Sequence, residues 1–341
     1  MRCRLLLLLP LATLVTVTLV TVTRSAGAVS SAELYRTIPH GYGKFEARLQ
    51  FVGGDGVIGS YFLWKDGSEM ADVFWNELDI EKVGADCELQ TNSLFGLPEK
   101  VHVGKDYGLT GLCEGYHTYA YEWTPEYIAW FVDGVEIRRD IGADAAAYAE
   151  NASEGMQVRF NLWPGDASFG GTFDPAILPV YEFVSWAQYS AYTPGTGDGG
   201  TNFTFTWREE FDTAPADWAM ASWDSPKALS THSPQNVVFV DGIAVLALTA
   251  DDALGFASTP PPDGEAPSTG GSDGGALASG GSPADASGGA TSMPMAPDEG
   301  SGCTYTTTHS RSLPVGASFG LLFTALVALR RRFSWRRVSA K

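Results

Sequence analysis

The sequence is poor in positive charge. It has 22 lysines and arginines against 40 aspartates and glutamates, which gives a formal net charge of −18. Because phosphate binding needs a positive surface, this balance argues against a nucleic-acid partner. A neutral polysaccharide needs no such surface, since apolar rings and hydrogen-bonding groups are enough to hold it. The ten tryptophans suit a ligand of that kind, although tryptophans also fill cores.

Helical periodicity is also scarce. The one helix-like stretch, 143–149, is short and alanine-rich, so we expect a surface turn there. Apolar and polar residues instead alternate through 43–49, and 127–132 is an apolar run rich in aromatic and β-branched residues; both patterns are typical of strands. The dipeptide Asp133-Gly134 then fits a two-residue hairpin turn. Together with the many glycines and prolines, these signals predict an all-β sandwich.

The N-terminus has the three parts of a secretory signal peptide. A basic segment at 2–4 precedes an apolar run at 5–22, and the small residues Ala26-Gly27-Ala28 offer a cleavage site. We therefore predict a signal peptide over 1–28 and a secreted protein. The alternative is an uncleaved N-terminal anchor, since the apolar run is long enough to span a bilayer.

Cysteine is rare. The four cysteines are Cys3, Cys87, Cys113 and Cys303. The first leaves with the signal peptide and the last lies near the far end, so Cys87 and Cys113 remain as a pair in an oxidising compartment. Each lies just outside a strand-like run, and a hairpin through 100–104 would bring both to the same edge. We expect a disulfide between them, while two free thiols stay open as the alternative.

A glycine-rich segment, 194–201, divides the β-rich part of the chain. It looks like a domain linker, yet the following segment, 203–250, is too short to bury a core of its own. We therefore expect 203–250 to add strands to the same sandwich. The folded domain is placed at 29–257.

The C-terminal part has no periodicity at its start. Residues 258–302 are mainly Gly, Ser, Pro, Ala and acidic residues, which predicts a disordered stalk. In 303–341 an apolar run at 315–329 precedes a cluster of arginines, which is typical of a membrane anchor or sorting tail. A GPI signal would end in its apolar tail, so that alternative is disfavoured. We expect a monomer, attached to the cell surface through this tail.

Three acidic residues alternate within one strand-like run: Glu77, Asp79 and Glu81. Residues i, i+2 and i+4 of a strand share a face, so the three carboxyl groups line up while Leu78 and Ile80 point the other way. Like charges side by side repel, so the arrangement costs stability unless function requires it. A solvated edge strand is the alternative, but the apolar neighbours favour a central strand.

This spacing suits glycoside hydrolysis with retention. The outer Cα atoms of such a run lie about 13 Å apart, and inward-leaning glutamates would bring their carboxyl groups to about 5–6 Å. Retaining enzymes need about 5–5.5 Å, whereas inverting enzymes need more room for a water molecule. One glutamate must be ionised to attack the anomeric carbon, and the other must protonate the leaving oxygen. This chemistry requires no cofactor.

Several segments resemble the lichenases (endo-1,3-1,4-β-glucanases) of glycoside hydrolase family 16. They are FWNELDIEKVG with its Glu-x-Asp-x-Glu signature, GYGKFEARLQ, LQTNSLF, GYHTYAYEWTPEYIAWFVDGVEIR and RFNLWPG. The laminarinase branch typically inserts a residue to give Glu-x-Asp-x-x-Glu, which this sequence lacks. The segment WREEFDTAPADWAMASW comes first in ordinary lichenases but last here. The order therefore resembles a circularly permuted lichenase, over about 31–250.

The resemblance implies a β-jelly-roll of two antiparallel sheets with a concave substrate cleft, and makes 29–257 a circularly permuted catalytic domain. It makes Glu77 the nucleophile, Glu81 the acid/base and Asp79 their helper, a residue that can hydrogen-bond to the nucleophile and raise the pKa of the acid. It also implies a set of residues that contact the glucan chain: Glu33, Phe62, Trp64, Asn92, Arg159, Asn161, Trp163 and Trp223.

These contacts have alternative interpretations. Phe62 or Trp163 could be core residues, and Arg159 could pair with an acid. The neighbours of Trp223 depart from the pattern of the permuted enzyme. Lichenases often hold a structural Ca²⁺ through backbone carbonyls, but Ser185 stands where an Asp or Asn is usual. Calcium therefore stays open, and we assign no metal ligand.

The predicted function is a secreted or surface-attached endo-β-glucanase that hydrolyses mixed-linkage 1,3-1,4-β-glucan with retention. One alternative is a laminarinase-like hydrolase of another β-glucan specificity. A second is a non-catalytic surface protein that binds glucan. The acidic triplet argues against the second, since a lectin has no need of three crowded carboxylates.

Overall fold

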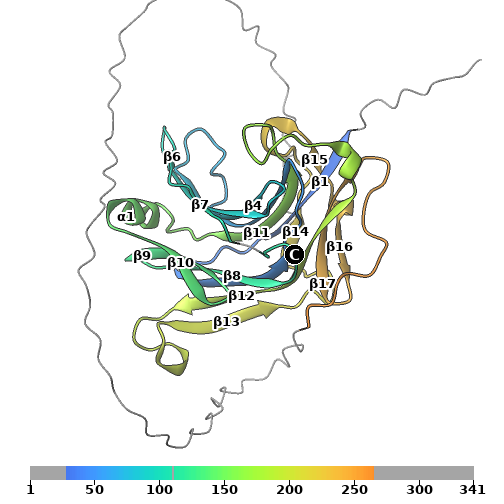
Figure 1. Cartoon of the computed structure of the whole chain (residues 1–341). Helices are drawn as coiled ribbons and strands as arrows, with labels where there is room; N and C mark the ends of the chain where they lie inside the picture. Colours follow the sequence, from blue (N-terminus) through green and yellow to red (C-terminus); the bar gives the residue numbers. More distant parts are fainter. Residues whose placement is uncertain (1–27, 110, 265–341) are drawn as a thin grey trace, which may run out of the picture. The chain divides into compact units, whose positions relative to one another are not determined.

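The computed structural model describes residues 28–109 and 111–264. These residues form two antiparallel sheets that face each other across a hydrophobic core (Figure 1). Residues 1–27 of the expected signal peptide, 265–302 of the expected stalk and the tail at 303–341 lie outside the described residues. Among the described helices, none has the length and apolar character needed to cross a membrane.

The first sheet has the order β14–β1–β11–β3–β4–β5, and both β6 and β7 pair with β5. Its strands are β1 (Val29–Arg36), β3 (Val57–Trp64), β4 (Trp75–Val83), β5 (Glu88–Gly96), β6 (Val101–His102), β7 (Lys105–Tyr107), β11 (Gln157–Pro164) and β14 (Trp218–Met220). The sheet curves away from the second layer (Figure 1). We call the face of β1, β11, β3, β4 and β5 that is turned away from the core the concave face.

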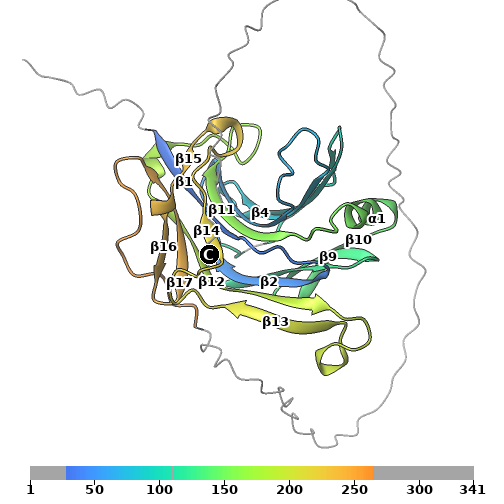
Figure 2. The same ribbon diagram turned by 180° about the vertical axis from the view of Figure 1, so that it is seen from behind.

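The second sheet has the order β10–β9–β8–β2–β12, and β13 and β17 pair with different halves of β12. Its strands are β2 (Gly43–Gln50), β8 (His117–Trp123), β9 (Tyr127–Val132), β10 (Val135–Ile141), β12 (Val180–Tyr192), β13 (Phe203–Glu209), β16 (Val237–Val240) and β17 (Ile243–Ala250). Figure 2 shows the two layers from behind, with β11 and β1 above β2 and β12. Strand β15 (Thr231–His232) pairs in parallel with the start of β1, which also pairs with β17.

The alternating strands build the core as expected. In β2 the residues Phe45, Ala47 and Leu49 are fully buried, and they alternate with partly exposed polar residues. The Asp133-Gly134 turn joins β9 to β10 with φ of 48° and 76°, as the two-residue hairpin turn requires. Sequence alternation therefore predicted β2 and its buried side, and the dipeptide predicted the turn between β9 and β10.

The C-terminal strands complete this sandwich. Strand β17 pairs with β12 and contributes the buried side chains of Leu246 and Leu248. The glycine-rich segment 194–201 is the loop of a hairpin, since Tyr192 of β12 lies opposite Phe203 of β13. The linker interpretation was therefore wrong, whereas the expectation that 203–250 adds strands to one sandwich is confirmed.

A short helix, α1 (Ala143–Glu150), replaces the surface turn expected at 143–149. Its alanines have high helix propensity, and Tyr148 is fully buried. The backbone carbonyl of Tyr148 also accepts a hydrogen bond of 3.0 Å from Asn76 Nδ2. Packing of Tyr148 therefore stabilises a helix that is too short to be stable alone. The short 3₁₀ helices are Pro175–Ile177, Asp198–Gly200, Pro226–Ala228 and Pro234–Asn236.

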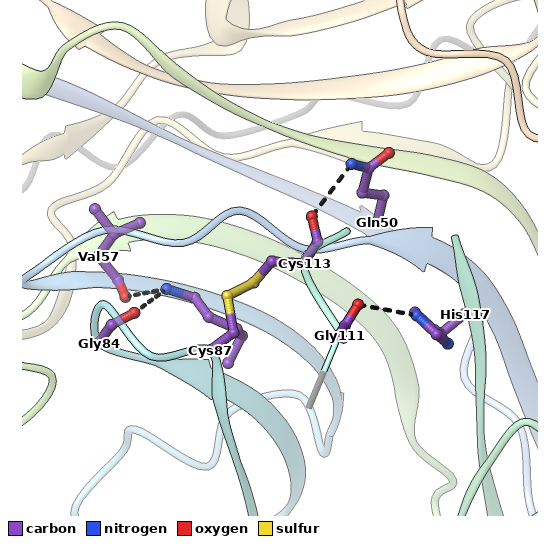
Figure 3. The surroundings of a disulfide bond; sticks show 8 residues. Gln50, Val57, Gly84, Cys87, Gly111, Cys113 and His117 are labelled. Carbon is purple, nitrogen blue, oxygen red and sulfur yellow. Dashed lines mark hydrogen bonds between the residues drawn. A yellow bond between two sulfur atoms is a disulfide. The ribbon is translucent and has the colours of Figure 1, made fainter. Parts of the chain in front are cut away.

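Cys87 and Cys113 form a disulfide (Figure 3), which confirms the expected pair and excludes two free thiols. The hairpin expected to bring them together was wrong. Strand β5, which follows Cys87, belongs to the first sheet, whereas β8, which follows Cys113, pairs with β2 and β9 in the second. The disulfide therefore links the two layers of the sandwich.

Residues 258–264, which we assigned to the stalk, pack against the sandwich. Asp263 forms an ion pair of 2.6 Å with Arg48, and the Tyr116 hydroxyl donates a hydrogen bond of 2.9 Å to the carbonyl of Pro261. The ordered domain thus extends at least seven residues beyond the boundary expected at 257. Composition alone cannot locate this boundary, because a proline-rich segment can still contact a folded surface.

Candidate active site

Strand β4 holds three carboxyl groups on the concave face. Asp79 is buried, while Glu77 and Glu81 on either side of it are half-buried. Leu78 and Ile80 point the other way and belong to the core between the sheets. The strand is paired with β3 on one side and β5 on the other, so the edge-strand alternative was wrong.

Each glutamate receives a hydrogen bond from a neighbour. The indole Nε1 of Trp75 donates to Glu77 Oε2 over 2.7 Å, and the hydroxyl of Ser60 donates to Glu81 Oε1 over 3.3 Å. Asp79 and Glu77 also share a hydrogen bond between their side chains. The two glutamates therefore have different surroundings, although they lie on the same strand.

Burial raises the pKa of all three carboxyl groups. For Asp79 the charges of Glu77 and Glu81 raise the pKa further, well above its ordinary value. For Glu81 burial acts first and the charge of Glu77 adds to it, with Ser60 in opposition. The rise for Glu77 is opposed by hydrogen bonds from Trp75 and Asp79. A neutral Asp79 can therefore donate its proton in a hydrogen bond to Glu77 and stabilise that carboxylate.

A lysine lies next to this site. Lys100 Nζ is 3.0 Å from the centroid of the Trp75 ring, and its charge lowers the pKa of Glu77. We did not single out Trp75 or Lys100 as site residues from the sequence. Trp75 could have been found, because it is two residues from Glu77 and therefore shares its face. Lys100 follows the next strand and has no such signal.

The register of the first sheet brings the expected sugar contacts onto the same face as the carboxyl groups. They are Phe62 and Trp64 on β3, Asn92 on β5, Arg159, Asn161 and Trp163 on β11, and Glu33 on β1. Phe62 and Asn92 lie on either side of Asp79, and Arg159 lies beyond Phe62. Phe62 and Trp163 are buried, but neither belongs to the core cluster between the sheets.

Three buried polar atoms on this face have no hydrogen-bond partner within 28–109 and 111–264. They are Asn92 Oδ1, Asn161 Oδ1 and Trp163 Nε1. Such groups are rare in folded proteins because their desolvation costs free energy. These two acceptors and one donor lie beside apolar rings. The hydroxyl groups of a sugar would form hydrogen bonds with all three.

Arg159 pairs with an acid, as the alternative interpretation held, and that acid is Glu33. The distance from Arg159 Nη1 to Glu33 Oε1 is 2.7 Å, and both side chains are buried. The Arg159 guanidinium also lies 4.6 Å from the ring of Tyr35 and 5.8 Å from that of Trp223. Trp223 is 43 % exposed, so its ring is open to a ligand.

Whether calcium binds stays open, as the sequence left it. Ser185 borders a hollow of about 550 Å³ on the second sheet, which is also lined by acidic residues. They are Glu210, Asp212, Asp241 and Asp263. Within the described residues, no group of three or more His, Cys, Asp or Glu is arranged to hold a metal ion.

A sheet with three aligned carboxyl groups and a row of aromatic and amide side chains defines a glycoside hydrolase, and comparison with known proteins agrees. Residues 12–176 match the glycosyl hydrolases family 16. A β-glucanase of Fibrobacter succinogenes is 35% identical over 247 residues, which are 71% of this chain and 70% of the relative. The chain belongs to glycosyl hydrolase family 16.

Other relatives match over a shorter length. A β-glucanase of Paenibacillus macerans is 29% identical over 167 residues, 47% of this chain and 64% of that protein, which is less than two thirds of its length. The solved structure of a Bacillus licheniformis β-glucanase is 22% identical, with 47% of this chain and 77% of that chain covered and a TM-score of 0.38.

Proposed function

We propose that this protein is a retaining endo-β-glucanase that hydrolyses mixed-linkage 1,3-1,4-β-glucan. The observation that carries the proposal is the alignment of Glu77, Asp79 and Glu81 on the concave face, with Trp75 donating to Glu77. The β-glucanases among its relatives support the substrate class. The absence of an inserted residue in the Glu-x-Asp-x-Glu run supports mixed-linkage specificity over laminarin.

In the first step Glu77 is the nucleophile and Glu81 the acid. A carboxylate oxygen of Glu77 bonds to the anomeric carbon, the glycosidic bond breaks, and the proton of Glu81 moves to the leaving oxygen. In the second step Glu81, now ionised, takes a proton from water as the water attacks the anomeric carbon and releases Glu77. Two inversions give net retention of configuration.

Asp79 lies between the two glutamates and serves both steps by staying protonated. Its pKa is raised by burial and by their charges, so it donates a hydrogen bond to Glu77 without adding a third negative charge. A neutral donor favours the ionised form of Glu77. Glu81 receives no hydrogen bond from a carboxyl group. Its hydrogen bond comes from the hydroxyl of Ser60, which is a weaker donor. This difference supports the proposed roles of Glu77 as nucleophile and Glu81 as acid.

The concave face is the proposed binding surface for the glucan chain. Phe62, Trp64 and Trp163 offer ring surface, and Asn92 and Asn161 offer unpaired acceptors beside it. Trp223 extends this surface beyond β1, because its ring lies 5.6 Å from that of Tyr35. A long face with groups on both sides of the carboxyl row suits internal cleavage of a polymer.

We further propose that the domain is circularly permuted. The hairpin of β12 and β13 is where the ends of an unpermuted chain would be joined. The match to the Fibrobacter relative covers 247 residues, whereas that to the Paenibacillus relative covers 167. A relative with a different segment order can be aligned over only one of the two rearranged parts, so a changed order predicts this difference. Secretion and surface attachment through 303–341 are also proposals, and the disulfide of Cys87 supports export.

Release of reducing sugar from barley β-glucan, lichenan, laminarin and carboxymethylcellulose tests the proposal. We expect turnover of the first two substrates and little of the last two. Equal rates on laminarin and lichenan would favour a laminarinase-like enzyme. Binding without turnover of any substrate would favour a glucan-binding protein. The Glu77→Gln variant is the matched control, because it keeps the shape of the site and removes the nucleophile.

A further inference from the structure

A buried histidine from the C-terminal segment contacts Glu33, whose side chain lies on the concave face. His232 lies on β15, which pairs in parallel with β1, and is only 2% exposed. Its Nε2 lies 3.5 Å from Glu33 Oε2, and its Nδ1 lies 2.9 Å from the hydroxyl of Ser31. His232 therefore lies between a fully buried hydroxyl and a carboxylate that faces the proposed substrate.

Chemistry gives the direction of the hydrogen bond with Ser31 and of the 3.5 Å contact with Glu33. Burial lowers the pKa of His232 to about 4, so the ring is neutral at working pH and carries one N–H. Burial raises the pKa of Glu33, and its ion pair with Arg159 opposes this rise; the paired carboxylate can only accept, which places this N–H on Nε2, 3.5 Å from Glu33 Oε2. Nδ1 then accepts from Ser31, whose oxygen accepts in turn from Ser230 over 2.7 Å. Ser31 is fully buried, so this Ser-His-Glu set has no access for a nucleophilic reaction.

Glu33 connects this chain of hydrogen bonds to the sugar-binding side chains. One oxygen pairs with Arg159 over 2.7 Å, and the carboxylate also receives a hydrogen bond from Trp223. Strand β1 is three strand spacings from β4 in the order β1–β11–β3–β4. At about 4.8 Å per spacing, Glu33 lies roughly 14 Å from the catalytic carboxyl groups. Only a substrate several sugar rings long can reach from one to the other.

We propose that His232 is a positioning residue that orients Glu33, and with it Trp223 and Arg159, to bind glucan chains extending beyond the catalytic carboxyl groups. The inference rests on the proposed glucanase function and deepens it, because it assigns a residue that favours long substrates over short ones. His232 does not touch the reacting atoms. Its loss should therefore weaken binding of long chains and leave the chemical step unchanged.

Two substitutions of His232 separate the effect of its hydrogen-bond donor from the effect of its side-chain volume. His232→Leu fills the space without a donor, whereas His232→Gln keeps an N–H near the place of Nε2. With barley β-glucan we expect His232→Leu to raise KM about tenfold at nearly constant kcat, because Glu33 loses its 3.5 Å contact with the Nε2 donor, and loss of one donor to a charged group has an effect of about this size. His232→Gln should stay within about threefold of wild type. With an aryl glycoside of two glucose units, all three proteins should have equal kcat/KM.

His40→Leu is the matched control for a general loss of packing. His40 is also a neutral histidine with a pKa lowered by burial to about 4, but its ring contacts Arg36 and Trp207 and no residue of the concave face. It should lower the melting temperature without changing KM for β-glucan. Equal KM values for wild type and His232→Leu, or equal defects in the Leu and Gln variants, would overturn the inference.

Failure of the proposed function gives a different result. In that case the wild-type protein itself would cleave none of the glucans. Calorimetric binding of a long β-glucan oligosaccharide to the wild type and both variants then decides the role of His232. Weaker binding of His232→Leu alone supports the inference, and equal binding by all three overturns it.

Discussion

Trp75 and Glu77 lie two residues apart on one face of β4, and the indole Nε1 of Trp75 donates a 2.7 Å hydrogen bond to Glu77 Oε2. On the same indole, Lys100 Nζ lies 3.0 Å from the ring centroid. A cation over an aromatic face is attracted to its electrons and fixes the ring in place. Both contacts favour the ionised form of Glu77, which burial would otherwise disfavour. The proposed nucleophile thus depends on two residues outside the Glu-x-Asp-x-Glu run.

Trp75→Phe keeps the ring and removes the donor to Glu77. The carboxylate is then less stabilised, so the pKa of Glu77 rises, and a higher pH is needed to ionise it. We expect the acidic limb of the kcat/KM profile on lichenan to move up by about one pH unit, or about 1.4 kcal/mol. An unchanged acidic limb would show that Glu77 does not need the indole donor.

Lys100→Met removes a charge whose field lowers the pKa of Glu77, so the acidic limb should again move to higher pH. The shift should be smaller than for Trp75→Phe, because Lys100 is exposed and acts through solvent as well. High salt should reduce the difference from wild type by screening the lysine. Lys105→Met is the control, since Lys105 lies over Tyr107 on β7, away from the glutamates. Equal profiles for both variants would contradict this role.

Replacing both Cys87 and Cys113 with alanine should destabilise the domain. The disulfide closes a loop of 26 residues between the two sheets. A loop of this size contributes about 3 kcal/mol by restricting the unfolded chain. Urea unfolding of the oxidised wild type and the double variant measures the difference. If both unfold at the same urea concentration, the disulfide contributes nothing to the fold.

Truncations test how far the domain extends. A chain ending at Gly264 should match the full chain in stability and activity. A chain ending at Ala257 loses the ion pair of Asp263 with Arg48 and the hydrogen bond of Tyr116, and should be less stable by about 1–2 kcal/mol. A chain ending at Tyr192 lacks β13 and β17 and should not fold. A cooperative, active fragment ending at Tyr192 would disprove this architecture.

Much of the fold was predictable because strand signals are local. The period of two assigned Leu78 and Ile80 to the core and the three acids to one face, and the dipeptide Asp133-Gly134 located the β9–β10 hairpin. The same period places Trp75 beside Glu77. The family resemblance then predicted sugar contacts on four different strands, which no single segment of the sequence indicates.

The parts that were missed depend on contacts between distant segments. The strands after Cys87 and Cys113 looked like a hairpin, but they belong to opposite sheets, and strand pairing at this distance is not encoded in local alternation. Helix α1 depends on burial of Tyr148, which composition does not reveal. His232 lies 199 residues from Glu33 in the sequence, and only the pairing of β15 with β1 brings them together.

The central claim is that Glu77 attacks the sugar and Glu81 supplies the proton, and trapping with azide tests it most directly. With an activated aryl β-glucoside, Glu77→Ala should be inactive until azide attacks from the open face and gives an α-glycosyl azide. Glu81→Ala should still form the glycosyl-enzyme, and azide should release it as the β-azide. The opposite pair of products would exchange the two roles. Full activity of both variants on lichenan would place the active site elsewhere and contradict the account.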